Sequence, residues 1–310
     1  MKKTILILGG YGFLGTNIMK YVDENLLDTY RFIVFDKFAQ HLGGVRFQCV
    51  DKCYVGDFAD CMLMERIFQE NHLDVVIHSL STTIPVNSLN ARYDVESNLL
   101  PTIDILGLMV KYGVNDIIYL SSGGAIYGTS HGKKHKESDD VFPISSYGVV
   151  KLAIEKYLMQ YQQLYCIHPL IIRLSNPYGP YHYNMKQGVC NVALALAHQG
   201  KTMKIWGDGK GRKDYIYVTD FVEILFRLWQ KGIRDDVINI GSGQTYSVNE
   251  IAEVVKKLMP SFQTEYIEAE TFDTSNFELD TTKLRLLIGE YTFHSLTEGM
   301  IKTNEWTKTI

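Results

Sequence analysis

The sequence lacks any long apolar run. No run approaches the ~20 apolar residues that a membrane-spanning helix needs, and glycines interrupt the N-terminal stretch MKKTILILGGYG after a short apolar core. Such a beginning is not typical of a signal peptide, so we expect a cytoplasmic protein.

A strong charge of either sign is also lacking. The formal net charge of −4 gives no reason to expect nucleic acid or an anionic membrane as a partner. Cysteine is scarce, with five residues in 310. Cys49, Cys53 and Cys61 lie close together, but no CxxC pair and no histidine at a zinc-type spacing accompany them. We therefore expect structural thiols, no disulfide framework and no metal site.

The first half of the chain contains short apolar runs that alternate with helical patterns. KTILILGG, YRFIVFDK, LDVVIHSL, DIIYLSS and HPLIIRLSN are near-continuous apolar runs, each separated from the next by a stretch with helical spacing. This alternation is typical of a parallel sheet that helices cover on both faces. The sequence therefore predicts an α/β fold with a doubly wound parallel sheet of the Rossmann type.

This rhythm changes after about Asn176, where shorter strands and helices predict a smaller, irregular C-terminal α/β lobe. One further apolar strand, Asp236–Ile240, predicts that the chain returns to the first sheet and that the two domains interleave. We expect a dinucleotide-binding domain of residues 1–176 with returning segments near 214–243, and a second lobe from the remainder of 177–310.

Three glycines predict a cofactor site at the first strand–helix junction. Gly9, Gly12 and Gly15 have a G-x-x-G-x-x-G spacing, and a backbone that approaches a pyrophosphate closely needs residues without Cβ. The helix behind them would present free N–H groups to the phosphates. Asp36 ends the next strand, where a carboxylate accepts the hydroxyls of an adenosine ribose. Because a carboxylate repels a 2′-phosphate and Lys37 is the nearby base, NAD is favoured over NADP.

Tyr147 and Lys151 form a candidate catalytic pair in the stretch SSYGVVKLAIEKYL. Four residues apart on a predicted helix, their side chains share one face. An ammonium near a phenol favours the phenolate, which predicts a lowered pKa for the tyrosine. A tyrosinate beside a hydride acceptor is a base for oxidising an alcohol and, in reverse, an acid for reducing a ketone.

With these residues the chain resembles the extended short-chain dehydrogenases/reductases, in the nucleotide-sugar epimerase/dehydratase group that includes the UDP-glucose 4-epimerases. The resemblance covers nearly the whole chain. It is carried by the motifs GGYGFLG, VGDFAD, DVVIHSL, SNLLPT, YLSSGGAIYG, SSYGVVK, RLSNPYGP, IWGDG, DYIYVTDFV and NIGSG.

The resemblance implies roles for further residues. Asp57 and Phe58 would flank the adenine, and Asn98 would brace the active-site backbone, although Asp57 could instead cap a helix. The other implied cofactor contacts are Phe13, Leu14, Lys37, Leu80, Ser81, Ser121, Tyr147 and Lys151. The implied contacts of the sugar nucleotide are Ser122, Asn176, Gln187, Gly188, Val189, Trp206, Asp208 and Lys213. Trp206 could equally be core packing. The resemblance also implies a homodimer through the helices near 98–112 and 147–164.

Three departures from the group's pattern restrict the reaction. The usual catalytic Ser/Thr position, four residues before Tyr127, is Gly123, so the nearest hydroxyl is Ser122. Gly124 and Ala125 replace the Asp-Glu pair of the 4,6-dehydratases, which leaves no acid or base for elimination of water. Two usual diphosphate-binding arginines are replaced by Lys213, next to Arg212, and by Glu270.

We therefore expect an NAD-dependent nucleotide-sugar 4-epimerase of the UDP-hexose type, with Tyr147 as the base, Lys151 as its partner and Ser122 as a donor to the C4 oxygen. An NAD(P)H-dependent reductase of a nucleotide-linked 4-keto-6-deoxy sugar would use the same pair. A non-catalytic dinucleotide-binding sensor is the third alternative.

Overall fold

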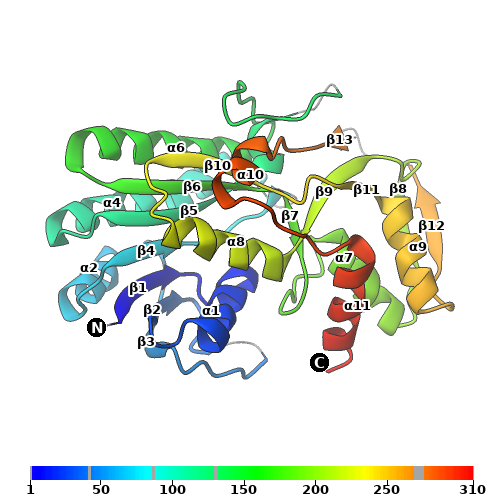
Figure 1. Cartoon of the computed structure of the whole chain (residues 1–310), viewed down its shortest axis with the longest axis horizontal. Helices are drawn as coiled ribbons and strands as arrows, with labels where there is room; N and C mark the ends of the chain where they lie inside the picture. Colours follow the sequence, from blue (N-terminus) through cyan, green and yellow to red (C-terminus); the bar gives the residue numbers. More distant parts are fainter. Residues whose placement is uncertain (1, 41–42, 86–87, 129–131, 269–275, 310) are drawn as a thin grey trace.

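The computed structural model describes residues 2–40, 43–85, 88–128, 132–268 and 276–309. A large parallel sheet with helices on both faces forms one part of the molecule, and a smaller lobe lies beyond the ends of its strands (Figure 1). The predicted α/β fold with a doubly wound parallel sheet is confirmed.

The large sheet has seven strands, and every neighbouring pair is parallel. Their order across the sheet is β10 (Asp236–Ile240), β6 (His168–Leu174), β5 (Asp116–Ser122), β4 (Val75–His78), β1 (Lys3–Leu8), β2 (Tyr30–Asp36) and β3 (Val50–Val55). The strand order reverses between β1 and β4, and the carboxyl ends of strands at such a point border the crevice where ligands of α/β proteins bind.

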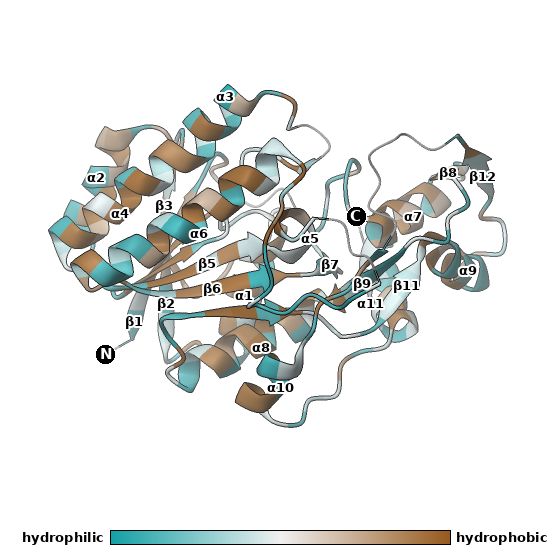
Figure 2. Ribbon diagram, turned by 90° about the horizontal axis from the view of Figure 1, so that it is seen from above, coloured by the Kyte–Doolittle hydropathy of each residue, from teal (hydrophilic) through white to brown (hydrophobic). Residues whose placement is uncertain are grey.

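Helices cover both faces of this sheet. One face carries α1 (Phe13–Asn25), α8 (Val218–Gln230) and α10 (Thr282–Ile288), and the other carries α2 (Cys61–Glu70), α4 (Leu100–Tyr112) and α6 (Ser146–Tyr165). Ile5 and Ile7 of β1 pack into the first layer, while Leu6 and Leu8 pack into the second. Burial on both faces explains why the strands are continuously apolar (Figure 2).

Within the described residues, the smaller lobe contains two short sheets and three helices. One sheet joins β7 (Asn176–Tyr178), β9 (Arg212–Tyr217), β11 (Thr245–Ser247) and β13 (Asn276–Phe277), and the other joins β8 (Met203–Trp206) to β12 (Thr264–Ile267). Its helices are α7 (Val189–His198), α9 (Val248–Leu258) and α11 (Leu296–Thr307). The short helices α3 (Ala91–Asp94) and α5 (Gly123–Ile126), and the π-helix η2 (Val95–Leu99), belong to the larger part.

The chain returns to the large sheet as predicted, because β10 pairs with β6. The returning segment begins with α8, whereas β9 pairs within the smaller lobe. A second return was not predicted: Leu284 and Ile288 of α10 pack into the core beside α8. Among the residues that the structure describes, no helix is long and apolar enough to cross a membrane.

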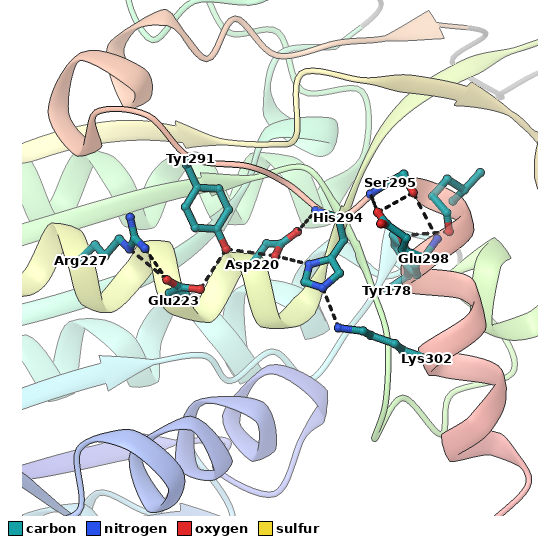
Figure 3. A network of polar contacts seen from close by, with 10 residues as sticks. Tyr178, Asp220, Glu223, Arg227, Tyr291, His294, Ser295, Glu298 and Lys302 are labelled. Carbon is teal, nitrogen blue, oxygen red and sulfur yellow. Dashed lines mark hydrogen bonds and ion pairs between the residues drawn. The ribbon is translucent and has the colours of Figure 1, made fainter.

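A polar network joins the two parts of the molecule around Asp220 of α8 (Figure 3). The buried Asp220 carboxylate accepts hydrogen bonds from the backbone N–H of His294 at 2.9 Å and from the Tyr291 hydroxyl at 3.0 Å. Its Oδ1 also lies 2.6 Å from Nδ1 of His294. Lys302 of α11 donates to Nε2 of the same ring at 2.8 Å. Helix α11 of the smaller lobe is thereby tied to the helix that covers the large sheet.

Candidate active site

The glycine turn after β1 has the geometry of a phosphate cradle. Gly9 has φ +79°, in the left-handed region that favours glycine. A Cβ on Gly15 would lie 2.4 Å from the carbonyl oxygen of Gly9 and 2.6 Å from that of Gly10, so only glycine fits there. Gly12 at the N-cap of α1 has no side chain that could cap the first turn, which begins with Phe13 and Leu14. The first N–H groups of α1 can therefore bind an anion.

Asp36 stands beside this turn at the end of β2. Its carboxylate accepts hydrogen bonds from the N–H groups of Tyr11 at 2.9 Å and Phe38 at 3.2 Å. Burial raises the pKa of Asp36, while these N–H groups lower it. The glycine turn and the carboxylate that is predicted to bind a ribose are thus adjacent, and the neighbouring Lys37 is exposed.

The two residues expected at the adenine lie after β3. Asp57 accepts a hydrogen bond from the Ala59 N–H at 2.9 Å, but it is Asp60 that caps α2 by accepting from the Leu63 N–H. The alternative helix-cap role for Asp57 is therefore wrong. Phe58 is buried and packs against the ring of Phe35. Their contact with an adenine stays a prediction.

Tyr147 and Lys151 share the first turns of α6. Ser145 caps this helix by accepting from the Gly148 N–H, and Nζ of Lys151 lies 5.8 Å from the centre of the Tyr147 ring. Lys151 also donates to the carbonyl oxygen of Leu120 at 2.9 Å, which anchors the ammonium on β5.

The prediction of a lowered pKa for Tyr147 is wrong for the chain without a cofactor. Burial raises the pKa of Tyr147 to about 12, although a hydrogen bond from the Ser122 hydroxyl lowers it. Burial also lowers the pKa of Lys151 to about 8, against the charge of Glu155, which raises it. In the chain by itself, desolvation therefore outweighs the effect that we expected from the lysine.

Ser122 is the hydroxyl that reaches Tyr147, because the strand ends there and α5 begins at Gly123. A Cβ on Gly123 would lie 3.0 Å from Leu279 and 3.2 Å from Phe277, inside a small apolar cluster. A side chain at position 123 would thus enter this cluster. Ser122, one residue earlier than the group's usual donor, stays the predicted hydroxyl donor.

A pocket beside this pair lies between the end of β4 and α6. Its lining includes Leu80, Ser81, Asn98, Tyr147 and Lys151, so the structure brings these predicted residues together. Asn98 accepts a hydrogen bond from the Thr82 N–H at 2.8 Å and donates to the Thr82 hydroxyl at 2.7 Å. The π-helical turn that carries Asn98 therefore braces the loop after β4.

Ser121 does not line this pocket. Its hydroxyl donates to Oε1 of the buried Glu155 at 2.5 Å. A contact of Ser121 with the cofactor stays a prediction, and the structure gives its side chain a different partner.

The predicted sugar-nucleotide residues lie in the smaller lobe. Asn176 donates to the carbonyl oxygen of Asp214 at 2.8 Å and so joins β7 to β9. Trp206 is 49% exposed, so core packing is excluded for it. The remaining residues lie before and at the start of α7 (Gln187, Gly188 and Val189), in the turn after β8 (Asp208) and in β9 (Lys213). Glu270 lies outside the described residues.

Arg212, next to Lys213, already has protein partners. Its guanidinium donates to Glu250 at 2.7 Å and to the carbonyl oxygen of Thr245 at 2.6 Å. These bonds hold β9 to β11 and to the capped start of α9.

Two further contacts beside the candidate site could not be predicted from spacing. Ser88 accepts a hydrogen bond from the Tyr147 N–H at 2.6 Å and donates to the buried Asp94 at 2.5 Å. His78, at the end of β4, lies with Nε2 2.9 Å from the hydroxyl of Thr102, and burial lowers the pKa of His78 to about 3. The only sequence signal was a histidine that ends a buried strand.

Comparisons with known proteins agree with this geometry. The profile of the NAD dependent epimerase/dehydratase family matches residues 5–241. A putative UDP-glucose 4-epimerase of Methanocaldococcus jannaschii is 33% identical over 256 residues, which are 81% of this chain and 81% of that protein. The dTDP-D-glucose 4,6-dehydratase of Mus musculus is 27% identical over 320 residues, 98% of this chain and 88% of the relative. The crystal structure of Thermotoga maritima UDP-glucose 4-epimerase with UDP-glucose has a TM-score of 0.90 at 28% identity and covers 99% of each chain.

The relatives include epimerases and dehydratases, so they define the class of the enzyme and not its reaction. The predicted cofactor, NAD, agrees with the family and with the cradle at Gly9–Gly15 beside Asp36. From its matched profile, its glycine turn and its Ser122–Tyr147–Lys151 arrangement, the chain is an enzyme of the NAD dependent epimerase/dehydratase family.

Proposed function

We propose that this enzyme is a nucleotide-sugar 4-epimerase of the UDP-hexose type that holds NAD tightly. The observation that carries the proposal is the meeting of Ser122, Tyr147 and Lys151 at the end of β5. The glycine turn and Asp36 would hold the cofactor, which supplies the hydride acceptor and donor and a positive ring that favours the phenolate. The side chains of the protein would carry out the proton transfers.

Tyr147 would take the proton from the C4 hydroxyl of the sugar. The neighbouring Lys151 ammonium stabilises the phenolate, and the Ser122 hydroxyl can donate a hydrogen bond to the C4 oxygen. After the 4-keto sugar has presented its other face, Tyr147 returns the proton to the C4 oxygen. The cycle leaves the cofactor unchanged and inverts C4.

The chain lacks an acid and a base for the elimination of water at the positions where the 4,6-dehydratases carry them. Gly124 and Ala125 follow Gly123 in α5, and Ala125 is buried. Neither residue can donate or accept a proton in this turn. This composition supports an epimerase over a dehydratase, although both occur among the relatives.

A panel of UDP-, dTDP-, GDP- and CDP-sugars tests the proposal. We expect inversion at C4, followed by NMR of the product sugar, with no net change in NADH absorbance. Net consumption of NAD(P)H with a 4-keto-6-deoxy sugar would show the reductase instead. Stoichiometric NAD in the purified protein without inversion of any sugar would exclude the epimerase. In that case, an unchanged NAD affinity of Tyr147→Phe would point to the sensor.

We also propose a homodimer through α4 and α6. Apolar side chains on these helices are exposed, namely Leu100, Val110, Tyr157 and Leu164. Light scattering of the purified protein measures the mass directly, and a monomer at micromolar concentration would contradict this proposal.

A further inference from the structure

Glu155 is a carboxylate with no exposed surface, one helical turn beyond Lys151 in α6. Its Oε2 accepts a hydrogen bond from Nη2 of Arg173 at 2.8 Å. Its Oε1 accepts from the hydroxyl of Ser121 at 2.5 Å. These hydrogen bonds and the Arg173 guanidinium compensate the buried charge of Glu155.

Ser121 and Arg173 face Glu155 together because they are register partners on the adjacent strands β5 and β6. Ser121 directly precedes Ser122. The carboxylate of α6 therefore holds the end of β5 at the residue before the proposed hydroxyl donor.

The second edge of the Arg173 guanidinium reaches the other side of the same turn. Nη1 of Arg173 donates to the hydroxyl of Tyr127 at 2.9 Å and to the carbonyl oxygen of Glu137 at 3.2 Å. The Tyr127 hydroxyl donates in turn to Asn239 of β10 at 2.9 Å. Residues 121 and 127 are thus both bonded to one ion pair.

The segment between these two anchors carries Ser122, followed by Gly123 and Gly124. Two consecutive glycines have the highest backbone entropy of any pair, so the segment needs fixation from outside. On the other side, Glu155, Lys151 and Tyr147 lie on one stripe of α6 at intervals of four residues.

We propose that Glu155 is a positioning residue, which holds the segment carrying Ser122 against the helix that carries Tyr147 and Lys151 through Ser121 and Arg173. Its kinetic consequence rests on the proposed epimerase function, whereas its effect on Tyr147 can be measured without a sugar. Glu155 touches neither the sugar nor the cofactor in this role.

Electrostatics act in the same direction. The charge of Glu155 raises the pKa of Lys151 against the burial that lowers it to about 8. Without this charge the lysine would lose its proton at lower pH, and the phenolate of Tyr147 would lose a neighbouring cation. Titratable and polar groups from three elements face Lys151. Strand β4 contributes His78, and β5 contributes Tyr119 and the Leu120 carbonyl. Its own helix contributes Tyr147 and Glu155, and Arg173 of β6 pairs with Glu155.

Three variants test the proposal. Glu155→Gln removes the charge, but it leaves Arg173 without its counter-ion and could fail to fold. Ser121→Ala and Tyr127→Phe keep the ion pair and remove one anchor each. Asp116→Asn is the matched control, because it removes the charge of an ion pair with Arg234, whose Nε lies 3.0 Å from Asp116 at the opposite end of the same strand β5.

The first readout needs no substrate. In NAD-loaded protein, the near-ultraviolet difference absorbance between each chain and its Tyr147→Phe counterpart reports the titration of Tyr147. We expect the midpoint to rise by roughly one pH unit in the folded variants, because Ser122 and Lys151 no longer support the phenolate. Asp116→Asn should leave the midpoint unchanged. An unchanged midpoint in Ser121→Ala and Tyr127→Phe would overturn the proposal.

The second readout is kinetic. We expect kcat to fall about tenfold to a hundredfold, because small misplacements of catalytic groups have effects of this size, while KM and the NAD content stay unchanged. Variants that only melt at lower temperature, with the kcat of the parent, would show a purely structural role and refute positioning. Loss of NAD in Ser121→Ala would show a cofactor contact instead. A shifted midpoint in a chain that inverts no sugar would refute the epimerase and leave the positioning role intact.

Discussion

The hydroxyl of Ser122 provides the sharpest test of the catalytic arrangement. Burial raises the pKa of Tyr147 to about 12, and the hydrogen bond from Ser122 is the interaction that lowers it. A hydrogen bond to a charged group contributes about 1.5–3 kcal/mol, and one pKa unit corresponds to about 1.4 kcal/mol. Ser122→Ala should therefore raise the pKa of the phenol by about one to two units.

This shift has a kinetic signature. Because the phenolate is the proposed base, kcat rises with pH until Tyr147 is ionised. In Ser122→Ala the rising limb of the pH profile should move to higher pH by about one to two units, which lowers kcat at neutral pH by about tenfold to a hundredfold. The assay is steady-state kcat against pH with NAD-loaded protein and the sugar nucleotide found in the panel.

Ser122→Thr is the matched control, since it restores a hydroxyl at the same position and should recover most of the activity. A Ser122→Ala profile that coincides with that of the parent would refute the assignment of Ser122. Loss of activity with no shift of the limb would exclude the effect of Ser122 on the pKa of the phenol and leave only its proposed hydrogen bond to the C4 oxygen of the sugar.

Three other predictions concern the cofactor site and the core. Gly15→Ala would place a Cβ 2.4 Å from the Gly9 carbonyl oxygen, so the purified protein should contain no NAD. In Gly12→Ala the Cβ would lie 3.3 Å from the same oxygen, so this variant should retain more NAD than Gly15→Ala. Asp36→Asn should weaken NAD binding about tenfold, measured by calorimetry, because it replaces one of the two carboxylate oxygens, which accept from Tyr11 and Phe38, with an amide that cannot accept; an unchanged affinity would exclude the ribose contact. Burial lowers the pKa of His78 to about 3. Between about pH 3 and the ordinary pKa of ~6.5, the unfolded chain therefore binds one more proton than the folded chain, and the free energy of unfolding falls as the pH drops through this window. His78→Leu should reduce the pH slope of the unfolding free energy in this window by about 1.4 kcal/mol per pH unit. Denaturant titrations at several pH values measure this slope, and an unchanged slope would show that the histidine is not buried and neutral.

Much of the site could be predicted because its residues follow local rules. Gly9, Gly12 and Gly15 need no tertiary information, since a strand, a turn and a helix are consecutive in the chain. Tyr147 and Lys151 are likewise one turn apart on a single helix. The pairing of β10 with β6 followed from one apolar run late in the chain.

The rest depends on contacts between distant residues. The packing of Leu279 and Phe277, more than 150 residues away, against the position where Gly123 would carry a Cβ could not be predicted from the sequence. The raised pKa of Tyr147 required the burial of its phenol, which no spacing in the sequence reports.

The sequence by itself determined the doubly wound sheet, the glycine turn that is predicted to hold NAD and the spacing of the tyrosine–lysine pair, because each arises from neighbours along the chain. Only the tertiary structure decided that Glu155 of α6 bonds Ser121 of β5 and Arg173 of β6, and that Ser88 and Asp94 hold the start of α6. The physical reason is that buried polar side chains must find partners wherever the fold brings them together, and the folded chain alone sets these pairings.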